Sequence, residues 1–308
     1  MTLSTRRSFF KSSLGLFALA LPEWSLPAQA LECIVRPPKL SFSTLGSPAW
    51  SLATILKTAV ENGYQGVELR GLQNEMDLTK CPEFSSAERA AQTRKLFADQ
   101  GVQIINLGSS AQLHHADIAK RRQNIAEAQR FIDLAQQLGC PYVRVFPDQL
   151  PADQPREHTI RLISEGLLEL GDYAKKRSVT VLLESHGELT RSDLLIQIMT
   201  AAEHSNVGLI WDVFNMWIDS HENVVDVYRK LKKYIRHTHI KDGINENGKH
   251  RYTLIGQGQA PLHEAIKALV DGGYQGFYSF EWEKRWHPEL EEPEVAMAHY
   301  PTAIKAYF

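Results

Sequence analysis

The chain lacks the features that mark several large classes of protein. It has three cysteines in 308 residues (Cys33, Cys81 and Cys140) and no CxxC pair, which argues against a cysteine zinc cluster and a full disulfide framework. Whether two of these cysteines form a disulfide stays open. Its 34 lysines and arginines nearly balance 36 aspartates and glutamates, and the basic residues form only short pairs. Without a basic field, nucleic acid is not an expected partner.

Two nucleotide-binding motifs and a membrane-spanning segment are also missing. No expected strand is followed by GxGxxG or by GxxxxGK[ST], so the usual phosphate-binding loops are absent from the sequence. The apolar run at residues 14–21 is too short to cross a bilayer. We therefore expect no stable membrane span in the mature protein.

The first thirty residues have the order of an export signal. Arg6 and Arg7 precede the apolar run, and Ala28-Gln29-Ala30 follows it as a small-residue cleavage site. This pattern resembles a twin-arginine signal peptide at residues 1–30. The alternative is an amphipathic helix or short membrane anchor. On the first interpretation the twin-arginine machinery exports a folded protein that begins near Leu31, to the periplasm or another extracytoplasmic space.

Residues 31–308 repeat one pattern at intervals of about thirty residues: a short apolar strand, a loop and an amphipathic helix. The expected strands are 40–45, 66–69, 102–107, 142–146, 179–184, 207–212, 235–240 and 276–281, and expected helices include 51–62, 87–100, 119–138, 158–176 and 262–271. Glycines follow several of these helices (Gly63, Gly101, Gly139 and Gly272). Eight such units predict one domain, an α/β protein with a closed (β/α)8 TIM barrel. A doubly wound open sheet is the alternative.

Alternation along the strands sorts their side chains into two sets. One phase is apolar, as in Val143 and Val145, and fits the layer between the strands and the helices. The other phase ends in a polar residue on every strand: Ser43, Glu68, Asn106, Arg144, Glu184, Asp212, His239 and Glu281. Because parallel barrel strands end at the same rim, these eight side chains should meet at the catalytic end of the barrel.

Three carboxylates and one imidazole end four successive strands. Glu184 lies in VLLESHG, Asp212 in GLIWDVFN, His239 in HTHIKDG and Glu281 in YSFEWEK. Each residue alone also fits a rim hydrogen bond or ion pair. Together they form a hard, oxygen-rich set suited to one divalent ion, Mn²⁺, Mg²⁺ or Co²⁺, with Zn²⁺ as a further candidate. A cation would also make the burial of neighbouring carboxylates tolerable.

The landmarks LLESHG, WDVFN, HTHIKD and YSFEWEK, in this order, resemble the sugar phosphate isomerase/epimerase family of xylose isomerase-like TIM barrels. The resemblance covers essentially the whole mature chain. It implies one divalent ion held by the four residues just named. It also implies that Glu184 and Glu281 are an acid/base pair on opposite faces of a carbohydrate substrate. The implied reaction is sugar isomerisation or epimerisation, by removal of a proton next to a carbonyl to give an enediolate that the metal holds.

The chain departs from the ketose epimerases of this family at two places. Asn215 stands where they commonly have a histidine, and the segment KDGINENGKH lacks the arginine that they place beyond the metal-binding histidine. No particular sugar is therefore assigned. An inosose dehydratase or another lyase on oxidised sugars or cyclitols is the alternative, and a non-catalytic periplasmic sugar-binding barrel is an alternative of another class. A DNA-repair endonuclease would need more histidines and a basic groove.

Further side chains near the rim are candidates for contact with a substrate: Glu68, Arg144, His186, Lys241, Trp50, Trp217 and Trp282. Each has a structural alternative. Glu68 could pair with Arg144, His186 could face water, and Lys241 could pair with Asp242. The tryptophans could cover the rim or a contact in a homo-oligomer, which stays open. His237 lies one pleat deeper than His239 and is expected to be a hydrogen-bonded core residue.

Overall fold

The computed structural model describes residues 37–246 and 249–308. The predicted signal peptide at residues 1–30, Cys33 and the expected first mature residues lie outside these ranges. Residues 38–308 form one unit by their internal contacts. In the described ranges, no helix combines the length and the apolar character needed to cross a membrane.

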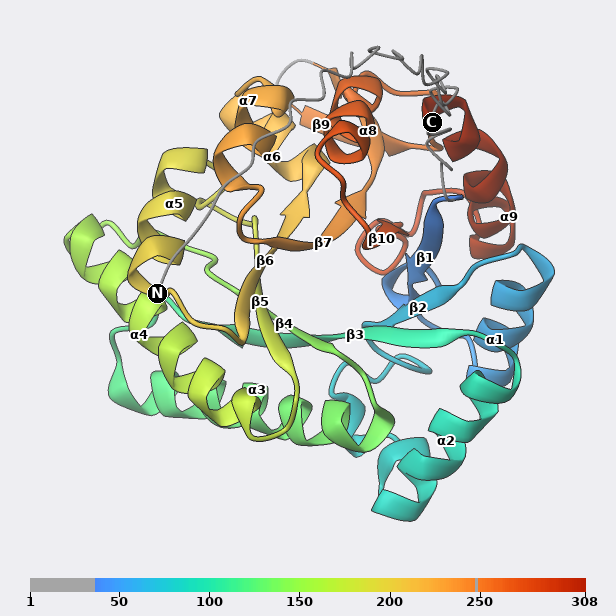
Figure 1. The fold of residues 1–308 in the computed structure, drawn as a ribbon, viewed down its shortest axis with the longest axis horizontal. Helices are drawn as coiled ribbons and strands as arrows, with labels where there is room; N and C mark the ends of the chain where they lie inside the picture. Colours follow the sequence, from blue (N-terminus) through green and yellow to red (C-terminus); the bar gives the residue numbers. More distant parts are fainter. Residues whose placement is uncertain (1–36, 247–248) are drawn as a thin grey trace, which may run out of the picture. The chain divides into compact units, whose positions relative to one another are not determined.

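Eight parallel strands close into a barrel, as predicted (Figure 1). They are β1 (Lys39–Ser43), β2 (Gly66–Leu69), β3 (Gln103–Gln112), β4 (Tyr142–Phe146), β5 (Thr180–Glu184), β6 (Val207–Asp212), β7 (Ile235–Ile240) and β10 (Phe277–Phe280). Closure is direct, because β1 pairs in parallel with both β2 and β10. This excludes the open doubly wound sheet.

The helices surround the strands (Figure 1). They are α1 (Leu52–Glu61), α2 (Ala87–Asp99), α3 (Ile118–Leu138), α4 (Arg156–Lys175), α5 (Ser192–Ala201), α6 (Val213–Ser220), α7 (Val224–Leu231), α8 (Leu262–Asp271) and α9 (Pro293–Ala303), with short 3₁₀ turns at Thr44–Gly46, Leu78–Lys80, Pro82–Phe84 and Ile304–Tyr307. The Gly139 cap of α3 is left-handed, as a glycine cap predicts. After α8 the positive φ belongs to Gly273 rather than to Gly272.

The two phases of the strands are buried in different ways. Apolar residues such as Val143, Leu183 and Phe280 are fully buried in the hydrophobic core. The eight polar residues that end the other phase are each 3% exposed or less. The predicted alternation is therefore confirmed, and the interior of the barrel is polar where its strands end.

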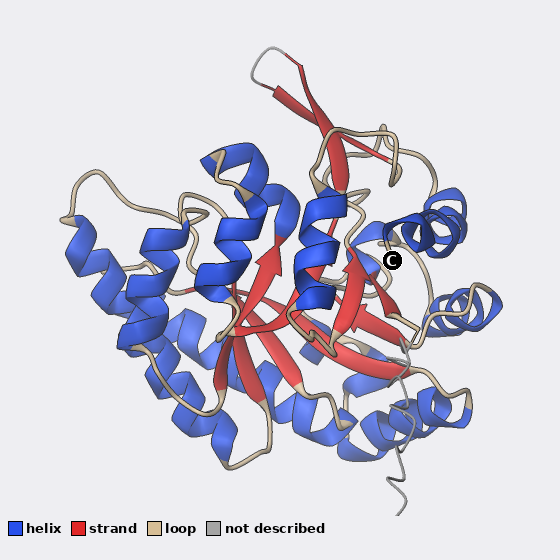
Figure 2. Ribbon diagram, turned by 45° about the horizontal axis from the view of Figure 1, so that its top comes forward, coloured by secondary structure: helices blue, strands red, loops and turns tan. Residues whose placement is uncertain are grey.

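One departure from the expected pattern follows β7, where the sequence suggested a plain loop. Strands β8 (Asp242–Glu246) and β9 (Lys249–Thr253) form an antiparallel hairpin. The hairpin projects beyond the barrel (Figure 2). It begins two residues after β7, so its root lies beside the residues that end the barrel strands.

Asp242 holds this root in place. Its Oδ1 accepts hydrogen bonds from the backbone N–H groups of Gly243 (2.8 Å) and Ala260 (3.2 Å). Its Oδ2 accepts from Gly256 (2.9 Å) and Gly258 (3.0 Å). A Cβ at Gly258 would collide with Oδ1, so glycine is needed for this close approach. The buried carboxylate thus ties the hairpin to residues 256–260.

We expect Asp242→Ala to lower the free energy of unfolding by about 2 to 4 kcal/mol, because four backbone donors lose their acceptor. Denaturant unfolding of the two proteins measures the difference. The matched control is Asp271→Ala, which removes an exposed carboxylate paired with Lys267 and should cost less than about 0.5 kcal/mol. Equal losses in both variants would contradict this role of Asp242.

Candidate metal centre at the carboxyl end of the barrel

Four side chains from neighbouring barrel strands meet at the carboxyl end of the barrel. Glu184 and Asp212 end β5 and β6, His239 lies in β7, and Glu281 directly follows β10. All four are buried, and one ligand atom from each lies within 4.8 Å of the others. The structure therefore brings together the four residues that the sequence selected as metal ligands.

The imidazole of His239 lies at the centre of this group. Its Nδ1 is 3.2 Å from Glu184 Oε1, 3.2 Å from Glu281 Oε2 and 3.7 Å from Asp212 Oδ2. Its Nε2 is 3.0 Å from Glu68 Oε2. Because an ionised carboxylate only accepts hydrogen bonds, Nε2–H donates to Glu68. Nδ1 is then the nitrogen that faces the three acids, as expected of a metal-binding histidine held by a second carboxylate.

Glu68 links His239 to the residue below it in the barrel. His237 Nε2 lies 3.2 Å from the same Glu68 oxygen, so the predicted hydrogen-bonded role of His237 in the core is confirmed. Burial raises the pKa of Glu68, but the two histidines outweigh it and hold the pKa well below its usual value. The ion pair between Glu68 and Arg144, considered from the sequence, does not form.

The electrostatics of the group call for positive charge at its centre. Burial lowers the pKa of His239, yet Glu281, Glu68 and Glu184 outweigh burial and raise it well above its usual value. Burial and Glu281 raise the pKa of Glu184, but Arg144 and His239 lower it to about 2. Burial also raises the pKa of Glu281, where His239 and Lys241 prevail and lower it. Both glutamates are therefore ionised at neutral pH.

Acids outnumber bases among the buried side chains at this end of the barrel. Besides Asp148 and Asp242, which have partners of their own, the buried acids here are Glu68, Glu184, Asp212, Glu281 and Glu283, and the buried arginines and lysine are Arg70, Arg144 and Lys241. A divalent ion at His239 would reduce the repulsion among these carboxylates. Glu184 Oε1, Glu281 Oε2 and Asp212 Oδ2 all lie within 3.7 Å of His239 Nδ1, so three carboxylate oxygens and one imidazole nitrogen converge on one point. The residues present fit such an ion.

Lys241 is shared among three acids. Its Nζ lies 2.7 Å from Asp212 Oδ2, 2.8 Å from Glu281 Oε2 and 2.9 Å from Glu283 Oε1. The pairing with Asp242 considered from the sequence is therefore wrong, since Asp242 binds the hairpin root. Sequence reasoning missed Glu283, although it follows Glu281 by two residues and so shares its phase.

Arg144 belongs to the same network. Its Nη1 donates to Glu184 Oε2 over 2.7 Å, and its guanidinium lies 3.7 Å from the centre of the Phe146 ring. Arg70, which directly follows β2, was not selected from the sequence. Burial and the charge of Arg144 lower the pKa of Arg70 to about 9, which still leaves the guanidinium charged at neutral pH.

His186 is held by a partner that the sequence did not reveal. Its Nδ1 lies 3.0 Å from Asp148 Oδ1, and its ring packs 4.4 Å from Phe146. Burial lowers the pKa of His186, but Asp148 and Glu184 outweigh it and raise the pKa. His186 is thus half-buried and oriented, rather than a loop histidine that only faces water. No pattern in the sequence linked residues 148 and 186, because they lie in different loops.

The three candidate tryptophans differ in their surroundings. Trp50 and Trp217 are half-buried. Trp282 is 2% exposed, its indole N–H donates to Glu291 O over 3.0 Å, and its ring stacks on Phe280. The expectation that Trp282 stacks on a sugar is therefore not supported. Tyr252 on the hairpin, missed in the sequence, has its ring centre 5.8 Å from Lys241 Nζ.

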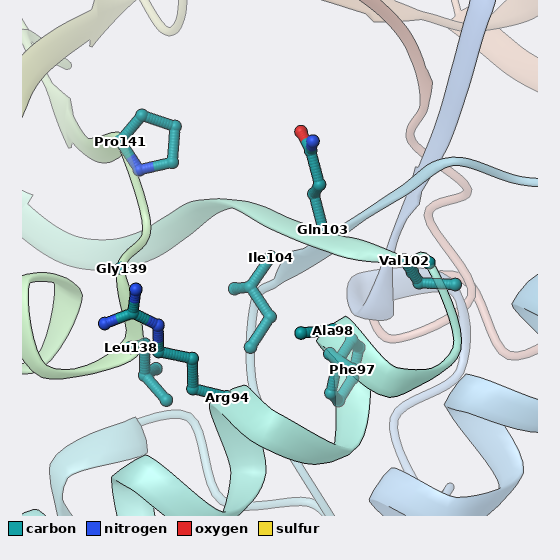
Figure 3. A pocket seen from close by; sticks show the side chains of 10 residues that line it. Arg94, Phe97, Ala98, Val102, Gln103, Ile104, Leu138, Gly139 and Pro141 are labelled. Atoms are coloured by element: carbon teal, nitrogen blue, oxygen red, sulfur yellow. The ribbon is translucent and has the colours of Figure 1, made fainter.

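A pocket of about 500 Å³ lies at the other end of β3 and β4 (Figure 3). Its lining includes Arg94, Phe97, Gln103 and Ile104, around the loops that precede the two strands. Barrel enzymes carry out their chemistry at the carboxyl end of the strands. We therefore place the candidate site at the acidic group and not at this pocket.

Comparison with known proteins agrees with the barrel fold. A sequence model described as xylose isomerase-like TIM barrel matches residues 56–301. Fructoselysine 3-epimerase of Shigella flexneri is 23% identical over 252 residues, which cover 79% of this chain and 89% of that protein. 3-Dehydroshikimate dehydratase of Bacillus anthracis is 26% identical over 235 residues (70% and 78%). The crystal structure of IOLI protein with a bound zinc atom has a TM-score of 0.74 at 21% identity, covering 88% of this chain and 99% of that one.

We expect Glu68→Ala to weaken the binding of Mn²⁺ by about 10- to 100-fold, because His239 loses the carboxylate that orients its ring. Calorimetric titration of protein treated with a chelator measures the affinity. His239→Ala should bind still more weakly. The control Asp172→Asn removes a carboxylate on α4 that pairs with His204 in the loop after α5, and this variant should bind like wild type. An unchanged affinity in Glu68→Ala would refute the orienting role.

Proposed function

The chain belongs to the xylose isomerase-like TIM barrel family, and from this premise we propose that it is a divalent-metal-dependent sugar isomerase or epimerase. The observation that carries the proposal is the group of Glu184, Asp212, His239 and Glu281, four buried side chains whose ligand atoms lie within 4.8 Å of one another. Distant relatives named as sugar epimerases and dehydratases support it. The substrate is a carbohydrate with a carbonyl group.

The residues of the chain account for the proton transfers. A divalent cation, when bound, polarises the carbonyl and stabilises negative charge on its oxygen. Arg144 holds one oxygen of Glu184, and Lys241 holds one oxygen of Glu281. Glu184 accepts the proton from the carbon next to the carbonyl. Glu281 passes a proton from the Lys241 ammonium group, which is hydrogen-bonded to it, to the opposite face of the same carbon, and exchange with solvent after product release restores both groups. Burial of both carboxylates keeps bulk water away from the reacting carbon.

One observation favours a dehydratase as the second candidate. Asp148 holds Nδ1 of His186, so Nε2 is the nitrogen that can donate a proton at the rim. In a dehydration, Glu184 removes the proton next to the carbonyl and a carbon–carbon double bond forms. The hydroxyl group on the next carbon leaves with a proton from His186, as water. An epimerase needs no such donor for a leaving group.

We expect protein loaded with Mn²⁺ to exchange the α-proton of a ketose or an inosose with deuterated solvent, and NMR measures the rate. Glu184→Gln and Glu281→Gln should each slow the exchange by about 100- to 10,000-fold, because each removes a proton-transferring carboxylate. The matched control is Glu165→Gln on the exposed face of α4, which should exchange like wild type.

The reaction products distinguish the isomerase or epimerase from the dehydratase. An epimeric or isomeric sugar supports the first proposal, and loss of water with a new double bond supports the dehydratase. Wild-type rates in either glutamine variant would refute the assigned roles. Absence of exchange with every metal and sugar, together with retained sugar binding, would favour a non-catalytic sugar-binding barrel.

We also propose that residues 1–30 export the folded barrel by the twin-arginine route. Arg6, Arg7 and the small-residue cleavage site support this. In a bacterial host, wild-type protein should reach the periplasm and begin near Leu31, as measured by fractionation and mass spectrometry. The double variant Arg6→Lys, Arg7→Lys should remain in the cytoplasm with its first thirty residues attached. Export of that variant at the wild-type level would exclude the route.

A further inference from the structure

Two arginines lie side by side at the carboxyl end of the barrel. Arg70 directly follows β2, Arg144 lies in β4, and Gly108 lies in β3 between these strands. A Cβ at Gly108 would lie 2.5 Å from Arg70 Cδ and 2.8 Å from Arg144 Nη2. The two side chains therefore use the space that glycine leaves free. Arg70 is 6% exposed and Arg144 is 2% exposed.

Both guanidinium groups keep hydrogen-bond donors without an acceptor. Arg70 Nη2 donates to Ser110 Oγ over 3.1 Å, but its Nη1 has no partner in the described part of the chain. Arg144 Nη1 donates to Glu184, but its Nε and Nη2 have none there either. Buried donors of charged groups are seldom left unsatisfied, because the loss of solvation is costly. A ligand that supplies acceptors would satisfy these unpaired guanidinium donors.

The neighbouring acids have other partners. Glu68 is bound by two histidines, and Glu281 and Glu283 are bound by Lys241. Glu127 Oε1 accepts the backbone N–H of Ser110 over 2.7 Å. None of these carboxylates accepts a hydrogen bond from the unpaired N–H groups of the two arginines. The two like charges therefore lie together with no anion bound directly to both.

We propose that Arg70 and Arg144 form a binding subsite for an oxyanion, so that the substrate is an acidic keto-sugar or cyclitol that carries a carboxylate or a phosphate. The inference rests on the proposed function, since the carbonyl end of the substrate occupies the metal centre. Arg144 connects the two ends, because one of its nitrogens binds Glu184 while the others face the anion. Planar guanidinium groups suit this geometry, since they bind oxyanions through paired hydrogen bonds.

Three ketoses with the same carbons C1 to C5 test the subsite: D-fructose, D-fructuronate and D-fructose 6-phosphate. They carry at C6 a hydroxyl, a carboxylate and a phosphoester. Calorimetry on protein loaded with Mn²⁺ measures their affinities without turnover. We expect at least one acidic ketose to bind about tenfold or more tightly than D-fructose. The tighter of the two identifies the anion as carboxylate or phosphate. Equal affinities for all three would overturn the proposal.

Variants test whether the preference for acidic ketoses over D-fructose depends on the two arginines. Arg70→Gln should remove the preference for acidic ketoses, and Arg70→Lys should keep part of it. Gly108→Ala should reduce it without changing any charge, because a methyl group displaces both arginines. Arg285→Gln, at an exposed hydrogen bond to Asn74, is the matched control and should keep it. A preference that survives both Arg70→Gln and Gly108→Ala would overturn the proposal.

The measurements separate this inference from the proposed function. If acidic ketoses bind preferentially but no α-proton exchanges, the subsite stands and the proposed chemistry falls. If protons exchange but D-fructose binds as tightly as the acidic ketoses, the chemistry stands and the subsite falls.

Discussion

Repulsion among buried carboxylates is the constraint on which the site depends. Parallel strands bring their ends to one rim, and here five of the buried acids at that rim gather around His239 and Lys241. Each acid has a specific cationic or hydrogen-bonding partner: two histidines for Glu68, Arg144 for Glu184, and Lys241 for Asp212, Glu281 and Glu283. These partners fix the direction of every carboxylate. Three of these carboxylates, from Glu184, Asp212 and Glu281, converge on His239 Nδ1.

The side chain of Asp212 both caps a helix and faces the candidate metal site. Its Oδ1 accepts the backbone N–H of Asn215 over 2.9 Å and so caps α6, while Oδ2 faces His239 and Lys241. A helix N-terminus prefers a capping acceptor with negative charge. The start of α6 therefore sets the angle of a candidate metal ligand. Replacing Asp212 would disturb both the cap of α6 and the candidate metal site. The other three candidate ligands are therefore better positions for testing metal binding.

The barrel and the four candidate ligands could be predicted because both follow from local periodicity. Polar residues at the inward-facing ends of consecutive parallel strands must lie together at the carboxyl end of the barrel. The same rule shows why the expectation for Trp282 failed, since the residue after Glu281 must point away from the interior. The pairing of Asp148 with His186 could not be predicted, because loop paths decide that contact. The segment after Asp242 is polar and rich in glycine and asparagine, which suits a loop as well as a hairpin.

The root of the hairpin has a consequence for how this protein can change over evolution. Asp242, the first residue of β8, binds four backbone N–H groups immediately after Lys241, so this one side chain fixes the base of the hairpin. Changes farther along the hairpin can therefore accumulate without shifting the ammonium group that binds three acids. The hairpin is thus a segment that can vary while Lys241 and the four candidate metal ligands keep their positions.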